Sequence, residues 1–178
     1  MDEQLMKIKL VLEGPLQAWG VPSEYTFRGT SYHPTKKGII GLIACCMGIP
    51  RGDARLESLQ SLLNVSYEIN ADADGTLQSG SILTDFQTVH KADGEKLNSA
   101  EGGFCDKDSL ILHKAYINDA SFTVHIKGPD ELMETIYAAL EDPVWVPYLG
   151  RKSCTPTVPL IPEKETDTQK ESECILQN

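Results

Sequence analysis

Hydrophobic and polar residues alternate near the start of the chain. In residues 5–13 an isoleucine and two leucines stand at every second position between mostly charged residues, which predicts a strand with one buried face. Gly14 and Pro15 are expected to end this strand. Residues 16–35 contain several glycines and prolines, and we expect them to be irregular.

Two helices and two strands are expected next. Residues 38–48 combine small and large apolar residues, which is typical of a buried helix packed on a sheet and ended by Gly48. A short second helix is expected over 55–63, where four leucines fall on one side. Residues 64–70 alternate again and predict a strand, and residues 77–90 predict a further strand or hairpin arm.

The second half of the chain begins with a long polar segment, residues 91–109. Loops of this length in compact domains are usually functional or disordered. Strands are expected over 110–116 and 120–127, followed by a helix over 131–140 that Asp130 caps.

Residues 144–149 are expected to form the last strand, and residues 163–178 a charged, mobile tail. The elements then follow the order strand, helix, strand, strand, helix, strand. This order predicts an α+β, ferredoxin-like βαββαβ fold, which hosts many functions and does not by itself select one.

Composition excludes several classes of protein. The 178 residues, 40% of them hydrophobic, suffice for one domain with a core of ordinary size. The longest apolar run, residues 38–49, is too short to cross a bilayer. The acidic N-terminus does not resemble a secretory signal. The sequence therefore predicts a cytoplasmic protein with no membrane partner.

The cysteines and histidines show no metal-ligand spacing. The five cysteines are odd in number and include no CxxC pair, and Cys45 and Cys46 are adjacent within an apolar run. Buried, reduced thiols are therefore expected in place of disulfides or a zinc site. The four histidines form no HExxH motif. The sequence predicts no metal and no cofactor.

The charged residues are segregated along the chain. A net charge of −10 by itself argues against nucleic-acid binding. However, residues 28–55 hold five basic residues against one acid, and residues 143–162 hold Arg151 and Lys152 and no acid. If the fold joins these two segments, they could form one basic groove on an acidic body. Alternatively, they are separate solvated faces.

The first candidate site is Pro34–Gly38, at the expected start of a helix. A helix N-terminus offers unpaired N–H groups and a positive dipole end, so Thr35, Lys36 and Lys37 there could hold a phosphate. The GxxxxGK[ST] spacing of a Walker loop is absent. The alternative is a plain helix cap with solvated lysines.

The second candidate site is the stretch 148–153. Tyr148 can stack on a base, and Arg151 offers a planar fork to a phosphate or a base edge. Lys152 adds a second cation beside Ser153. The alternative is an exposed basic turn without a ligand.

A third possibility is catalytic. A cluster of tyrosine, lysine and histidine side chains can cleave RNA without a metal, with histidine as general acid or base and lysine steadying the phosphorane. The residues available for such a cluster are Tyr32, His33, Lys36, His113 and Lys114. Residues of these types also occur together by chance.

Several motifs, in this order, resemble the CRISPR-associated RAMP superfamily. The stretches that carry the resemblance to its N-terminal signature are Gly14–Gly20, Arg28, Pro34–Lys36 and Gly38–Leu42. Residues 85–89 and 119–124 are similar to strand motifs, and Pro147–Cys154 to the closing motif, of the small subunit that binds the 5′ handle of the guide RNA in type I-E Cascade. The resemblance covers about residues 5–162.

The resemblance implies a non-catalytic subunit that holds the CRISPR RNA 5′ handle. The implied partners are that RNA, the backbone subunit and the large subunit of Cascade, and target DNA only indirectly. The residues expected to bind the RNA are Arg28, Thr35, Lys36, Lys37 and Gly38 on one wall of a groove, and Tyr148, Arg151, Lys152 and Ser153 on the other.

The resemblance also implies a RAMP domain over residues 1–162, in which the polar segment 91–109 matches a thumb-like loop. Family members usually continue beyond the closing motif, so the C-terminal end is expected to be shortened. Two other functions are open: a metal-independent endoribonuclease that processes precursor CRISPR RNA, because some type I systems use this subunit family so, and a regulatory domain that binds a small molecule.

Overall fold

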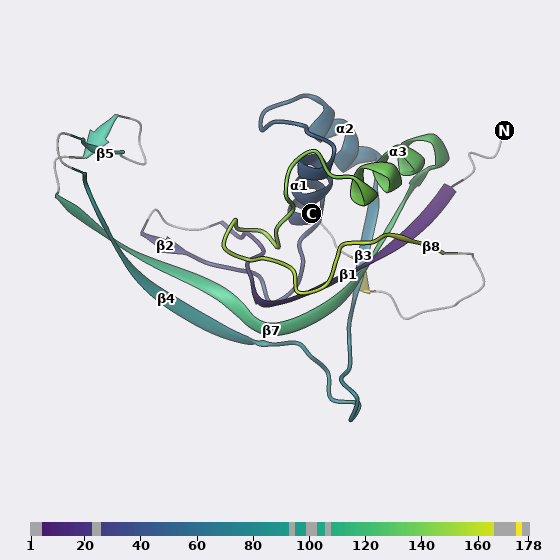
Figure 1. Cartoon of the computed structure of the whole chain (residues 1–178), viewed down its shortest axis with the longest axis horizontal. Coiled ribbons are helices and arrows are strands. Elements are labelled where there is room, and N and C mark those ends of the chain that lie inside the picture. Colours follow the sequence, from purple (N-terminus) through teal and green to yellow (C-terminus); the bar gives the residue numbers. More distant parts are fainter. Residues whose placement is uncertain are drawn as a thin grey trace.

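The computed structural model describes residues 5–22, 26–92, 95–98, 103–105, 108–165 and 174–175. Within them the chain forms a mixed α+β fold with one main sheet and three helices, as the sequence predicts (Figure 1). In chain order the elements are β1 (Leu5–Gln17), β2 (Phe27–Arg28), α1 (Lys36–Cys46), α2 (Arg55–Leu62), β3 (Asn64–Ile69), β4 (Ser81–His90), β5 (Leu97–Asn98), β6 (Phe104–Cys105), β7 (Ser109–Pro129), α3 (Asp130–Glu141), β8 (Glu163–Glu165) and β9 (Cys174–Ile175).

The main sheet is built around β7. Its strands follow the order β8-β1-β7-β3-β9, and β2 and β4 also pair with β7. The second half of β7 pairs antiparallel with β1 and β3, whereas residues 109–118 pair antiparallel with β4. We call β2, β4 and residues 109–118 of β7 the arm. Figure 1 shows that the arm extends to the left of the helices and bends upward, with β5 near its far end.

The three helices lie together over one face of the sheet (Figure 1). Alternate residues of β1 and β7 point toward them, as the period of a strand requires. The core that results is apolar and fully buried at its centre, where it contains Ile8, Leu10, Leu12, Phe122, Val124 and Ile126 of the strands with Ile39, Ile43, Met133 and Ile136 of the helices.

Polar side chains cover the opposite face of the sheet. Asn70 accepts a hydrogen bond from Thr123 at 2.7 Å and donates one to Ser121 at 2.9 Å. His125 points away from the helices but is buried, and its Nδ1 lies 2.8 Å from a carboxylate oxygen of Glu165 in β8. The histidine is therefore part of the attachment of β8.

The prediction of two strands over 110–116 and 120–127 is wrong, because β7 is one strand of 21 residues. Asp119 lies between the two expected strands with φ +52°. Aspartate tolerates this left-handed conformation better than most residues, so the backbone adopts it without leaving the sheet. Likewise, β1 continues past Gly14 and Pro15 to Gln17, because Gly14 and Leu16 remain paired with β7.

The prediction of a last strand over 144–149 is also wrong. This segment is irregular, and Val144 donates a hydrogen bond to the carbonyl of Cys46, at the end of α1, at 2.9 Å. Pro147 lacks the N–H group that a strand ladder uses. The edge beside β1 is occupied by β8, whose residues Glu163–Glu165 the sequence assigned to the tail.

Helix boundaries differ from the prediction by a turn or less. Helix α1 begins at Lys36, two residues early, and α3 begins at Asp130, so Pro129 and not Asp130 occupies the cap position. Of the expected thumb-like segment 91–109, the described part includes the small hairpin β5–β6. Residues 93–94, 99–102 and 106–107 of that segment, and most of the expected tail, lie outside the described residues. None of the described helices is long and apolar enough to span a membrane.

Candidate nucleic-acid interface

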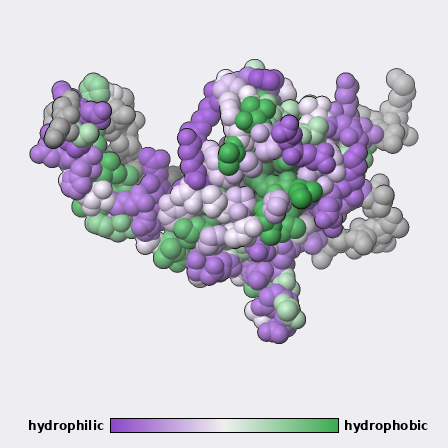
Figure 2. All heavy atoms as spheres, in the orientation of Figure 1, coloured by the Kyte–Doolittle hydropathy of each residue, from purple (hydrophilic) through white to green (hydrophobic). Residues whose placement is uncertain are grey.

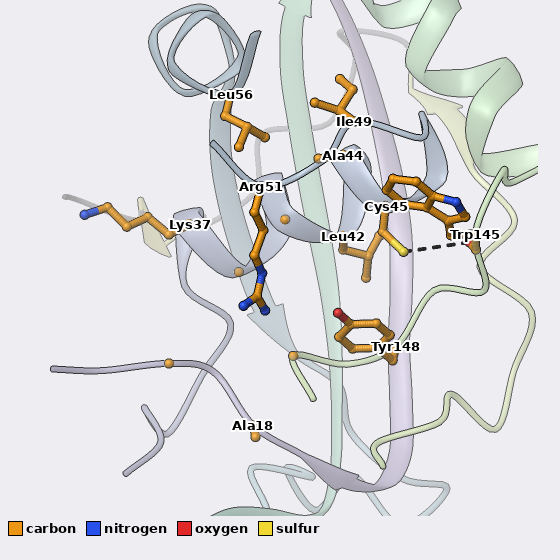
Figure 3. Close-up of a pocket in the computed structure, with 14 residues that line it drawn as sticks. Ala18, Lys37, Leu42, Ala44, Cys45, Ile49, Arg51, Leu56, Trp145 and Tyr148 are labelled. Atoms are coloured by element: carbon orange, nitrogen blue, oxygen red, sulfur yellow. Dashed lines mark hydrogen bonds between the residues drawn. The ribbon is translucent and has the colours of Figure 1, made fainter. Parts of the chain in front are cut away.

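Helix α1 and residues 145–150 line a cleft of about 390 Å³ (Figure 3). Lys37 and Gly38 come from the start of α1, Arg51 from the loop that follows it, and Tyr148 and Gly150 from the second basic segment. The cleft therefore joins residues of the two basic segments of the sequence. Figure 3 shows Arg51 extending toward the same opening as Tyr148, while Lys37 extends outward from the rim.

The start of α1 is fixed by its cap and by a close contact. The Thr35 hydroxyl accepts a hydrogen bond from the Gly38 N–H at 3.2 Å, as an N-cap side chain does. A Cβ atom on Gly38 would lie 2.7 Å from the Trp19 ring. Thr35 and Gly38 thus have structural roles, and the two lysines carry the charge: Lys36 is half-buried and Lys37 exposed.

Trp19 is a core residue. It is fully buried, and its indole Nε1 donates a hydrogen bond to Gln17 at 3.0 Å. The adjacent Ala18 N–H donates to the carbonyl of Leu149 at 3.0 Å. The end of β1 therefore positions both α1 and the segment that carries Tyr148.

Residues 148–154 form a closed turn against β1. Leu149 donates to the carbonyl of Cys154 at 2.8 Å, and Cys154 donates to that of Arg151 at 2.8 Å. Gly150 has φ +88°, and a Cβ atom on it would lie 1.7 Å from the carbonyl oxygen of Ala18. Only glycine fits this position. The turn leaves Lys152 and Ser153 exposed.

Arg151 ties this turn to the arm. Its Nη1 donates to the carbonyl of Ala115 in β7 at 2.9 Å. Its Nη2 donates to the carbonyls of Arg28 and Gly29 at 2.9 and 3.1 Å, and its guanidinium lies 4.7 Å from the Tyr116 ring centroid. Three of the five N–H donors of a guanidinium are thus committed to backbone carbonyls. That Arg151 also contacts RNA stays a prediction.

The predicted RNA-binding residues are therefore in two neighbouring places. Lys37, Gly38 and Tyr148 line the cleft, whereas the exposed Arg28 lies on β2, where its carbonyl meets Arg151. The prediction did not include Arg51, although it belongs to the first basic segment. It also did not include Trp145, which could have been recognised as a tryptophan between two prolines.

Burial raises the pKa of the two adjacent cysteines at the end of α1. Burial raises the pKa of the Cys46 thiol to about 11. Burial also raises the pKa of Cys45, and the charge of Lys152 opposes this shift. Both thiols are therefore protonated at neutral pH. Cys45, Cys46 and Cys154 are free thiols, of which Cys46 and Cys154 are buried and Cys45 is partly buried, and the described residues contain no cluster of metal-ligating side chains.

The residues considered for RNA cleavage have separate surroundings. The His33 ring stacks on Tyr67 of β3 at 4.7 Å between centroids, and its Nδ1 lies 3.1 Å from the carbonyl of Pro34. His113 lies on the arm, where its ring meets Phe86 of β4 edge-on at 5.3 Å. The two imidazoles therefore pack against aromatic residues of different strands, His33 against β3 and His113 against β4.

The fold and the cleft together describe an α+β protein with a basic, partly aromatic groove, which suits a polyanion. The family model described as CRISPR-associated protein (Cas_Cas5) matches residues 7–174. The chain is 34% identical over 161 residues to the CRISPR system Cascade subunit CasD of Escherichia coli (strain K12), with 85% of this chain and 68% of that protein covered. The chain therefore belongs to the Cas5 family of CRISPR-associated proteins.

Solved structures agree with this assignment. A chain of a CRISPR RNA-guided surveillance complex superposes with a TM-score of 0.72 at 31% identity, over 86% of this chain and 61% of that chain. A crystal structure of a Cas protein superposes with a TM-score of 0.60 at 25% identity, over 93% and 66%. The chain thus spans somewhat under two thirds of the length of these structures.

Proposed function

We propose that the chain is a non-catalytic subunit of a Cascade surveillance complex that holds the 5′ handle of the guide RNA in the cleft between α1 and residues 145–150. The observation that carries this proposal is the meeting of Lys37, Arg51 and Tyr148 in one cleft. Family membership and the likeness to a subunit of a guide-RNA complex support it.

Each part of the cleft has a distinct role in this proposal. Lys37 and Arg51 neutralise phosphates of the handle, and the N-terminal end of α1 adds a favourable dipole. The Tyr148 ring offers a flat face on which a base can stack. Arg28 contributes a further cation where the turn meets the arm, and Lys36, Lys152 and Ser153 lie at the margins. Arg151 fixes the position of the turn relative to β2 and β7 through its hydrogen bonds.

The same proposal covers the topology. The elements β1, α1, β3, β7, α3 and β8 follow one another in the chain, and their four strands belong to one sheet, which supports a ferredoxin-like fold. The arm, together with residues 91–109, is then the thumb-like part, which reaches toward the backbone subunit. The large subunit is a second protein partner. A complex that carries guide RNA works where that RNA is made, so we expect the subunit in the cytoplasm.

The acidic remainder of the chain has a consequence for selectivity. The net charge of −10 repels RNA from surfaces outside the cleft. Binding should therefore depend on a small number of cations and fall steeply as salt is added.

Replacing Lys37 and Arg51 by glutamine should weaken binding of a synthetic 5′-handle RNA at least tenfold. It should also flatten the dependence of log K on log salt by about 1.4, at about 0.7 per phosphate contact to a single strand. A binding titration at several salt concentrations measures both. Throughout the titration, without metal, the RNA should stay uncut.

Arg55 supplies the matched control, because its guanidinium pairs with Asp53 at 2.7 Å and does not line the cleft. Arg55→Gln should bind RNA like the parent chain. Equal losses in the two variants would show that only overall charge matters, and a single metal-independent cut in the RNA would make the chain an endoribonuclease.

A further inference from the structure

Strand β8 is held at the outer edge of β1 by polar contacts. It has three residues, Glu163–Glu165, and pairs antiparallel with residues 7–9 of β1 (Figure 1). Strands of a sheet with one covered face are usually held by apolar side chains that point into the core. None of the three side chains of β8 is apolar. Its attachment therefore depends on backbone pairing and on charge.

The Glu165 carboxylate is bound by two basic side chains. Its Oε2 lies 3.4 Å from the Lys7 Nζ and 2.8 Å from the His125 Nδ1. The His125 and Glu165 side chains are only 3% and 14% exposed. A carboxylate so far from water needs direct contacts with basic or donor groups. Lys7 and His125 thus form a carboxylate-binding site, which the chain fills with its own glutamate.

The neighbouring contacts extend this site along the strand. The Lys9 Nζ lies 3.1 Å from a carboxylate oxygen of Glu163, two residues from Glu165 and so on the same face of β8. On the other face, the Lys164 Nζ lies 2.7 Å from Glu134 of α3 and 5.0 Å from the Tyr137 ring centroid. The edge of β1 therefore suits an extended segment in which acid, base and acid follow one another.

The segment before β8 has attachments of its own. The Thr157 N–H donates a hydrogen bond to the carbonyl of Glu13 at 2.9 Å, and Leu160 and Pro162 are buried. The ion pairs that Glu163 and Lys164 make are exposed, and exposed pairs contribute little to stability. Strand β8 can therefore leave the edge while the preceding segment stays in place.

We propose that the outer edge of β1, with Lys7, Lys9 and His125, is a docking site for an extended acidic segment of a protein partner, and that β8 occupies it in the isolated chain. Such a segment pairs with the β1 backbone and places carboxylates against the two lysines. RNA suits the site less well, because it cannot extend the sheet and because Glu68 lies 3.7 Å from the His125 Nε2. These residues do not line the RNA cleft, so the inference goes beyond the proposed function.

The experiment is a binding titration with a labelled synthetic peptide of residues 158–165. The parent chain should bind it weakly, because β8 competes from within the same molecule at a high effective concentration. The Glu163→Gln, Glu165→Gln double variant, in which β8 is held less firmly, should bind the peptide at least tenfold more tightly. Replacing both glutamates of the peptide by glutamine, or adding Lys7→Gln to the variant, should cost at least tenfold in affinity.

Lys114→Gln, added to the same double variant, is the control, because it removes an equal charge from the arm. It should leave peptide binding unchanged. The inference is overturned if the parent and the double variant bind the peptide equally, or if Lys114→Gln and Lys7→Gln cause equal losses. Displacement of the peptide by a short single-stranded RNA would also overturn it and make the edge an RNA site.

Hydrogen exchange on the parent chain provides a check that needs no variant. The amides of residues 163–165 should exchange well before those of residues 122–126 in the centre of the sheet. Simultaneous exchange of both segments would show that β8 leaves only when the chain unfolds, which would contradict the inference. Handle RNA should bind every variant named for this site like the parent chain, so failure of the docking site and failure of the proposed function are separate results.

Discussion

Alanine at position 150 is expected to lower the free energy of unfolding by about 4 kcal/mol and to abolish handle binding. Gly150 has φ +88°, and a Cβ atom on it would lie 1.7 Å from the backbone oxygen of Ala18. A backbone atom cannot rotate away as a side chain can. The turn would have to leave β1, which would remove Tyr148 from the cleft.

Gly52→Ala is the matched control for this change. Gly52 has φ +83°, but a Cβ atom there would meet nothing within 4 Å. It should therefore cost only the strain of the left-handed backbone, about 1 to 2 kcal/mol. Urea unfolding of both variants measures the difference, and equal losses would show that the contact with Ala18 is not what fixes the turn.

Arg151→Ala is expected to lower the free energy of unfolding by about 3 kcal/mol, because it removes hydrogen bonds from a charged donor to three backbone carbonyls. The affinity for RNA should also fall, because Arg151 no longer connects the turn to β2. Arg151→Lys should restore little of either, because an ammonium cannot reproduce the planar fork. Chemical unfolding and an RNA titration of both variants provide the two measurements.

Lys152→Ala gives the comparison for charge alone. This side chain is exposed on the same turn, so its loss should leave stability unchanged and flatten the salt dependence by about 0.7 if it contacts one phosphate. If Arg151→Lys bound RNA like the parent chain, the charge of Arg151 and not its hydrogen bonds would be what matters.

The sequence predicts the parts of the fold that depend on local pattern. The alternation in β1 and β3 and the apolar faces of the helices gave the correct elements, since burial of one face dictates these periods. The continuity of β7 was not predictable, because it depends on the pairing with β1 on both sides of the left-handed Asp119, at Asn118 and at Ala120. Residues 144–149 are as apolar as a strand, and only their attachment to α1 shows otherwise.

The candidate site was predictable to a similar extent. Local composition identified two basic segments, and the structure places Lys37 and Tyr148 from them in one cleft. The partners of Arg151 are backbone carbonyls 36 to 123 residues away, which no sequence pattern reveals. The same holds for Trp145, whose carbonyl meets the Cys45 thiol 100 residues away. Roles that depend on such distant contacts can only be assigned in the folded chain.

The most direct test of the central claim is to locate the RNA on the chain by ultraviolet cross-linking. The purified chain, bound to a 5′-handle RNA at low salt, is irradiated, and the cross-linked peptides are identified by mass spectrometry. If the RNA lies in the cleft between α1 and residues 145–150, cross-links are expected in the peptide that contains Trp145 and Tyr148, and they should be suppressed in the Lys37→Gln, Arg51→Gln double variant. Cross-links confined to the polar face of the sheet around Asn70 and Thr123, with this peptide unmodified, would contradict it.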